Sequence, residues 1–249
     1  MADPITVAVL NESTLTSDTE LAPIIAAYQE DLWQNYGLWS PGTQVTLQQV
    51  PKGDPSPAGC WQLVWLDDAD QAAALGYHEL SADGRPLGKV FVRTTQACGQ
   101  TPSRVGSHEL FEMLVDPWLN RYTTDWDRAY CIEVGDLLSL DDQGREGLGG
   151  VLLSGIALPA AYFANYGTRY DIGGRLTQGL PHVLPAEGAY LMWQGGAGFE
   201  ANATAPHFIQ PPPLFDPDDF LHLQAAHGSR RHRRIMGSHA WRRSTVAVV

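Results

Sequence analysis

The pattern of apolar and polar residues in the first half of the chain predicts strands interleaved with helices. An apolar run at 5–10 predicts a first strand. A helix is predicted over 17–36, because Ser17 and Glu20 have the spacing of a capping box. Composition and alternation predict further strands at four places: 44–50, 61–66, 76–80 and 89–93. An Asp-Gly dipeptide between the last two is typical of a hairpin turn.

The next helix, predicted over about residues 104–116, carries a polar stripe. At about 100° per residue, His108, Glu112 and Asp116 fall within about 80° of one another, and Glu109 lies beside them. Apolar side chains cover the rest of the circumference: Leu110, Phe111, Met113, Leu114 and Val115. A helix that is apolar on most sides is usually buried, and buried carboxylates are costly unless they are paired or bound to a metal. The stripe therefore predicts a metal site or a dense hydrogen-bond network.

This helix resembles the active-site helix of zincin metallopeptidases, with Glu112 in place of the second histidine of their His-Glu-x-x-His signature. The longer pattern Ser-His-Glu-x-x-Glu-x-x-x-Asp-Pro over 107–117, followed by Glu-Val-Gly-Asp over 133–136, resembles a divergent zincin group of bacterial and phage genomes. Shorter pieces similar to that group lie at 76–78, 158–163 and 187–190. The resemblance covers roughly residues 5–200.

The resemblance implies an α+β, zincin-like fold, in which a twisted, mostly β-sheet packs on the active-site helix and its edge strand binds extended peptide. It implies a zincin-like domain over 1–200 with a loop-rich C-terminal part. Composition indicates a Pro-rich arm and an Arg-rich tail over 201–249. The resemblance further implies that His108 and Glu112 bind zinc and that Glu109 is the general base that activates a water molecule.

A catalytic zinc site needs a third protein ligand besides water. The family pattern makes Asp136 the preferred candidate; Glu133 is either the alternative ligand or a hydrogen-bond partner behind the ligands. Asp116 lies roughly 12 Å along the helix axis from His108, so it is better placed to cap the helix or orient the returning chain after Pro117 ends it. One histidine with two carboxylates is rich in oxygen for zinc, so calcium and manganese stay open as alternatives.

Each of these residues also has a structural interpretation. His108 and Glu112 could form a buried ion pair, and Glu109 could be favoured in the first helical turns by the helix dipole alone. His78, on a predicted edge strand, could approach the site, but we expect a solvent-facing or hydrogen-bonded histidine there.

The composition excludes some classes of protein. The chain has 249 residues, 44% hydrophobic and 18% charged, enough for a sizeable core. Its start has no basic and apolar secretory signal, and no apolar run approaches the roughly 20 residues that span a bilayer. Three cysteines without metal-type spacing suit a reducing compartment. We therefore expect no membrane partner and a cytoplasmic or virion-associated protein.

The net charge of −12 is unevenly distributed, since residues 228–249 carry six arginines and no acidic residue. Apolar residues interleaved with these arginines indicate a segment that docks on other protein subunits. No nucleic-acid module is recognisable, so protein docking is favoured over nucleic-acid binding. The predicted partner-binding residues are Arg230, Arg231, Arg233, Arg234, Trp241, Arg242 and Arg243.

Two functions follow from these observations. The first is a zinc metallopeptidase, bacterial or phage-encoded, that acts on a peptide or protein substrate. The alternative is a catalytically inactive zincin-like structural or accessory protein of a phage particle, anchored through its C-terminal arm. The acidic body, the Pro-rich arm and the basic tail favour this alternative.

Overall fold

The structure is a computed structural model that describes residues 3–70, 74–124, 129–138, 144–163, 166–179, 190–194 and 199–201. Its architecture is mixed α+β, which confirms the predicted class. The chain forms two compact units. The first comprises Met1–Val115 and Asp142–Ser154, and the second comprises Asp116–Asp141 and Gly155–Val249. The predicted Pro-rich arm and Arg-rich tail lie outside the described residues, apart from Ala201 at the arm's first position.

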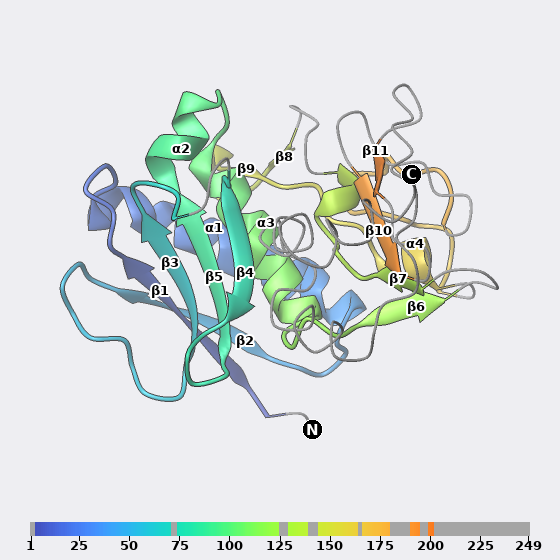
Figure 1. Ribbon diagram of the computed structural model, residues 1–249, viewed down its shortest axis with the longest axis horizontal. Helices are drawn as coiled ribbons and strands as arrows, with labels where there is room; N and C mark the ends of the chain where they lie inside the picture. Colours follow the sequence, from blue (N-terminus) through green and yellow to red (C-terminus); the bar gives the residue numbers. More distant parts are fainter. Residues whose placement is uncertain are drawn as a thin grey trace, which may run out of the picture. The chain divides into compact units, whose positions relative to one another are not determined.

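A five-stranded sheet forms the centre of the first unit (Figure 1). Its strand order is β2-β1-β3-β5-β4. All neighbours pair in parallel except β4, which pairs antiparallel with β5 at one edge. The strands are β1 (Ile5–Asn11), β2 (Val45–Val50), β3 (Trp61–Leu66), β4 (Gly76–Leu80) and β5 (Pro86–Phe91).

The predicted strands are confirmed, but the bounds predicted for the last one, 89–93, are wrong. β5 already begins at Pro86, because its pairing with β4 continues back to the turn. It ends at Phe91, and Val92 and Arg93 belong to the short helix α2 (Val92–Ala97).

Two longer helices, α1 (Asp18–Asn35) and α3 (Pro102–Val115), pack on one face of the sheet (Figure 1). The predicted capping box is present at the start of α1, where Ser17 and Glu20 exchange hydrogen bonds. A 3-10 turn, Tyr36–Leu38, follows α1. α3 begins slightly before the predicted start, because proline is tolerated in a first helical turn, where its missing N–H leaves no bond unmade.

Tyrosines of α1 and the following turn hold α3 in place. The hydroxyl of Tyr28 donates to the carbonyl of Ser103 at 2.6 Å, and that of Tyr36 donates to the carbonyl of Leu114 at 3.1 Å. The two helices approach closely at Gly106, where an added Cβ would lie 2.3 Å from the Tyr28 hydroxyl. α3 is therefore fixed near both of its ends.

The strand register determines which residues face α3. Leu63 of β3 is paired with Gly88 of β5, and Gly88 is paired with His78 of β4. Because paired residues share one face of a sheet, these three point the same way. An added Cβ on Gly88 would lie 3.8 Å from the Cβ of Glu109, so this is the face that α3 covers.

A hairpin of β8 (Arg145–Glu146) and β9 (Leu152–Leu153), with a 3-10 turn over Leu148–Gly150, completes the first unit. The second unit contains a four-stranded sheet of order β11-β10-β7-β6. Its elements are β6 (Tyr122–Thr124), β7 (Ala129–Cys131), a 3-10 turn (Asp136–Leu138), α4 (Pro159–Tyr162), β10 (Tyr190–Gln194) and β11 (Phe199–Ala201). No helix within the described ranges is long and apolar enough to cross a membrane.

Candidate metal centre

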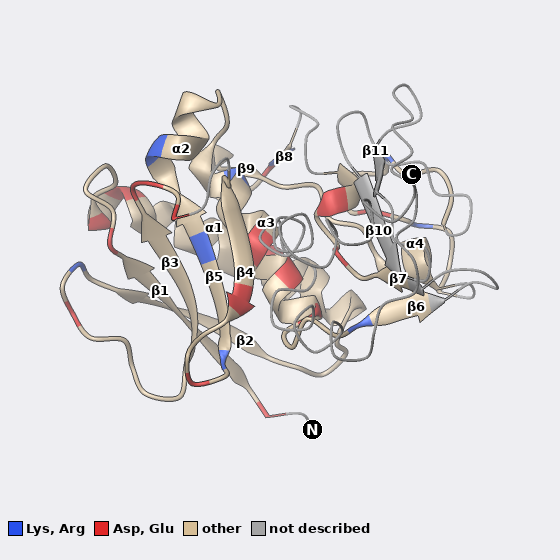
Figure 2. Cartoon of the chain, viewed as in Figure 1, with Lys and Arg blue, Asp and Glu red and all other residues tan. Residues whose placement is uncertain are grey.

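The polar stripe of α3 is buried, as its apolar surroundings predict. His108, Glu109 and Glu112 are only 4%, 1% and 2% exposed. Acidic positions are visible on α3 behind the sheet (Figure 2). Since an ionised carboxylate loses its hydration on burial, these groups need a compensating partner or a cation.

Three residues of the stripe bring their donor atoms together. His108 Nε2 lies 3.1 Å from Glu112 Oε1, one helical turn along. One donor atom each from His108, Glu109 and Glu112 fall within 4.8 Å of one another. The i, i+4 spacing therefore places an imidazole nitrogen and a carboxylate oxygen where one ion could contact both.

His78 lies beside these residues, and the expectation of a solvent-facing histidine there is wrong. Its side chain is 1% exposed, and its Nδ1 lies 3.5 Å from Glu112 Oε2 and 3.8 Å from Glu109 Oε2. The reason is the strand register, which turns His78 toward α3. The close approach depends on Gly76, where an added Cβ would lie 2.8 Å from Glu109 Cγ and 2.7 Å from the carbonyl oxygen of Lys89.

Several polar atoms of this cluster lack a hydrogen bond within the described part of the chain. They are both ring nitrogens of His78 and Oε1 of Glu109. Buried polar atoms of native proteins nearly always have a partner, and exceptions often mark a bound ion or water. The cluster therefore has the unsatisfied donor atoms expected of a metal site.

The charges within this cluster shift the pKa values of its members. Burial lowers the pKa of His78, but the neighbouring carboxylates of Glu109 and Glu112 outweigh burial and raise it to about 9. Burial raises the pKa of Glu112, but the imidazoles of His108 and His78 outweigh burial and hold its pKa well below the usual range. A divalent cation could replace the protons that balance the carboxylates, because histidine binds metals in its neutral form.

The residues fit zinc chemically. Zinc accepts imidazole nitrogen at about 2.0–2.1 Å and carboxylate oxygen at a similar distance, usually in tetrahedral sites. His108 and Glu112 provide one donor of each type, and Glu109 stands next to His108 with a carboxylate oxygen that no described residue bonds. This donor set also leaves Glu109 available for proton transfer.

Ser154 lies behind the ring of His108 and is itself held by Ser107. The Oγ of Ser154, at the end of the hairpin, lies 3.5 Å from His108 Nδ1. The backbone N–H of Ser154 donates to Ser107 Oγ at 2.7 Å, and that hydroxyl donates to the carbonyl of Arg104 at 2.9 Å. A polar group behind the ring of a ligand histidine selects its tautomer and orientation. No local pattern around Ser154 could have revealed this role.

The remaining predicted site residues belong to the second unit. Glu133 and Asp136 are each 2% exposed. The carbonyl of Glu133 accepts a hydrogen bond from the Tyr162 hydroxyl at 2.6 Å, and Asp136 opens a 3-10 turn. Asp116 Oδ1 accepts the backbone N–H groups of Asn120 and Arg121 at 2.9 and 3.0 Å, so Asp116 orients the returning chain, as predicted.

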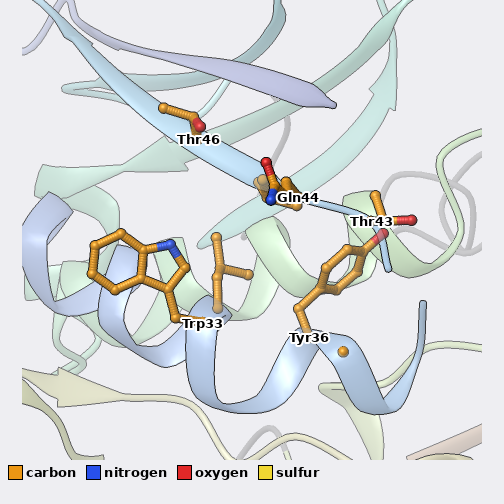
Figure 3. Close-up of a pocket in the computed structure, with 8 residues that line it drawn as sticks. Trp33, Tyr36, Thr43, Gln44 and Thr46 are labelled. Carbon is orange, nitrogen blue, oxygen red and sulfur yellow. The ribbon is translucent and has the colours of Figure 1, made fainter. Parts of the chain in front are cut away.

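A cavity of about 390 Å³ lies elsewhere in the first unit, between α1 and β2 (Figure 3). Trp33 and Tyr36 rise toward the β2 side of the cavity, and Trp33 is 72% exposed. Its lining comprises Leu32, Trp33, Tyr36, Gly37, Thr43, Gln44, Val45 and Thr46. Because these include no histidine, cysteine or carboxylate, the cavity lacks metal-ligand chemistry.

The predicted partner-binding residues of the tail, Arg230 to Arg243, lie outside the described residues. Comparison of the chain with protein-family models, curated proteins and solved structures found no match.

Proposed function

We propose that this chain is a zincin-like, metal-dependent peptidase, in which His108 and Glu112 bind zinc and Glu109 is the general base. The observation that carries the proposal is the buried stripe of α3, with His108 Nε2 3.1 Å from Glu112 Oε1 and a Glu109 oxygen that no described residue bonds. A purely structural ion pair would account for His108 and Glu112. It would not by itself account for the second buried carboxylate, Glu109, which lies 3.8 Å from His78 Nδ1.

Zinc, when bound, polarises a carbonyl group and makes water a stronger acid at neutral pH. Glu109 then has the task of accepting the proton of the attacking water and passing it to the leaving amine. His108 and Glu112 hold the ion, and Ser154 helps to orient the His108 ring.

The edge strand β4 suits an extended peptide substrate. β4 is the last strand of the sheet and pairs with β5 along one side. A peptide that adds to the other side would gain backbone hydrogen bonds, the mode known as β-augmentation. Because β4 also carries His78, a peptide on this strand would run beside the metal centre.

The resemblance assigns the third ligand to Asp136, with Glu133 as the alternative. One histidine and two carboxylates would make an oxygen-rich site, for which calcium and manganese compete with zinc. The alternative function, an inactive accessory protein of a phage particle, keeps the same fold without requiring Glu109 to act chemically.

The test is to incubate the purified full chain with casein and a peptide library, with saturating zinc and with a chelator. We expect zinc-dependent cleavage that the chelator abolishes. Protein that binds zinc stoichiometrically but cleaves no substrate would contradict the peptidase and favour the accessory role. Protein that binds no metal would contradict the metal centre as well.

A further inference from the structure

We propose that Arg145 is a positioning residue of the metal centre, which holds Ser154 against the ring of His108 and so determines how that ring presents Nε2. The inference rests on the proposed function and deepens it, because it assigns the support of one proposed zinc ligand. Arg145 lies on the two-residue strand β8, far from His108 in the sequence, so no short motif connects the two residues.

The first argument is how the guanidinium group of Arg145 is bonded. Its two terminal nitrogens donate to the carboxylate of Asp31 on α1, Nη1 to Oδ1 at 2.9 Å and Nη2 to Oδ2 at 2.5 Å. Its Nε donates to the backbone carbonyl of Ser154 at 2.7 Å. Because the arginine fork is planar and rigid, anchoring two of its nitrogens on α1 fixes the direction of the third.

The second argument is that this anchor is sheltered from solvent. The side chain of Asp31 is 4% exposed and that of Arg145 is 13% exposed. Asn35 Nδ2 also donates to Asp31 Oδ1, at 2.7 Å, so the carboxylate is held from two sides. Buried ion pairs are screened much less by water and salt than surface pairs. Arg145 is therefore a firm point from which the end of the hairpin is held.

The third argument is that both backbone groups of Ser154 are fixed. Its carbonyl accepts from Arg145, and its N–H donates to Ser107 Oγ on α3 at 2.7 Å. Ser154 lies one residue beyond Leu153, which forms the last pair of the hairpin with Arg145, so strand pairing alone does not hold it. These two hydrogen bonds therefore determine where the Ser154 side chain lies.

The position of Ser154 matters because its contact with His108 is long. Ser154 Oγ lies 3.5 Å from His108 Nδ1, beyond the usual hydrogen-bond range of about 2.7–3.2 Å, so a small shift of the backbone strengthens or breaks the contact. His108 Nε2 lies 3.1 Å from Glu112 Oε1. A hydrogen bond from Nδ1 to Ser154 keeps the ring proton on Nδ1 and leaves Nε2 for a metal. Arg145 thus acts on the ligand through the backbone of Ser154.

The test measures the zinc affinity of the full chain by competition with a chromophoric chelator. Arg145→Lys keeps a cation for Asp31, but its single nitrogen cannot serve both Asp31 and the Ser154 carbonyl. Zinc affinity should therefore fall about 10–100-fold, the loss typical of groups that orient a ligand, and Ser154→Ala should cause a loss of the same order. Glu146→Gln, at the neighbouring exposed position of β8, is the matched control and should bind zinc as tightly as wild type.

The double variant separates positioning from a purely structural role. If Arg145 acts through Ser154, Arg145→Lys should cause almost no further loss of zinc affinity in a Ser154→Ala background, because the effects of residues in one chain of contacts are not additive. Losses that multiply, or an unchanged zinc affinity of Arg145→Lys, would overturn the role of Arg145 and leave the proposed function intact. Wild type that binds no zinc would overturn both.

Asp31→Asn repeats the comparison with a milder change, for the case that Arg145→Lys does not fold. The amide oxygen still accepts a hydrogen bond from Arg145 but carries no charge, so the loss of zinc affinity should be smaller. It should again disappear in the Ser154→Ala background, and a loss that persists there would contradict positioning through Ser154. Thermal unfolding of the metal-free proteins checks that each variant is folded.

Discussion

The two faces of the β4–β5 hairpin carry ionisable clusters of opposite character. On the face away from α3, Lys89 Nζ lies 2.7 Å from Asp70, 2.7 Å from the Tyr77 hydroxyl and 3.1 Å from Glu79. The Lys89 side chain is 18% exposed and that of Asp70 is 45% exposed. On the face toward α3, His78 contacts carboxylates that are almost fully buried.

The difference separates a structural cluster from a functional candidate. In the outer cluster, Lys89 forms ion pairs with Asp70 and Glu79 at ordinary distances and in contact with solvent, so the cluster needs no bound ion. The inner cluster buries two carboxylates and leaves ring nitrogens of His78 without hydrogen bonds among the described residues. A buried polar atom without a hydrogen bond costs free energy. Such atoms are found where ligand binding or catalysis compensates for that cost.

The largest expected effect is that of Glu112→Ala on the inner cluster. The variant should lose stoichiometric zinc, with an affinity more than about 100-fold lower, because a direct ligand is removed. Thermal stability with zinc should fall to that of the metal-free protein, since a ligand stabilises only the state that binds it. Elemental analysis and thermal unfolding measure both effects. Unchanged zinc content would refute Glu112 as a ligand.

Glu109→Gln should keep zinc and the fold but reduce kcat/KM by about 10²–10⁴-fold, because an amide cannot accept the proton of water. The matched control is Glu79→Gln, one strand position from His78 on the outer face, which should retain full turnover. Peptide cleavage and zinc content are measured on both variants. Full turnover of Glu109→Gln would exclude Glu109 as the base.

Gly76→Ala should lower the free energy of unfolding by about 1–3 kcal/mol, the usual cost of overpacking. The added Cβ would lie 2.7 Å from the carbonyl oxygen of Lys89. A backbone atom cannot move away by a change of rotamer, as a side chain can. Gly37→Ala is the control, because nothing lies within 4 Å of a Cβ there. Urea unfolding compares the two, and equal stability would mean that β4 and α3 are less tightly packed than described.

The smallest expected effect is that of Lys89→Met on the outer cluster. Partly exposed ion pairs contribute about 0–1 kcal/mol, so the loss of stability should be about 1 kcal/mol or less and smaller at high salt. Zinc affinity should not change. A zinc affinity that falls with this variant would show that the two faces of the hairpin are coupled.

The sequence by itself determined the features that depend on neighbouring residues. The capping box of α1 and the polar stripe of α3 were predictable, because a helix brings residues three and four positions apart together. The strands of the sheet were predictable from composition and alternation, apart from the bounds of β5. The pairing of His108 with Glu112 follows from the same helical period.

Only the tertiary structure decided the position of His78. A strand has two faces, and which one meets a helix depends on its register with the neighbouring strand. Here the pairing of His78 with Gly88 turns the imidazole toward α3, whereas a shift by one residue would turn it away. The hydrogen bonds of Ser154 depend equally on the return of a distant hairpin. Contacts between segments far apart in the chain leave no periodic pattern, so only the folded structure reveals them.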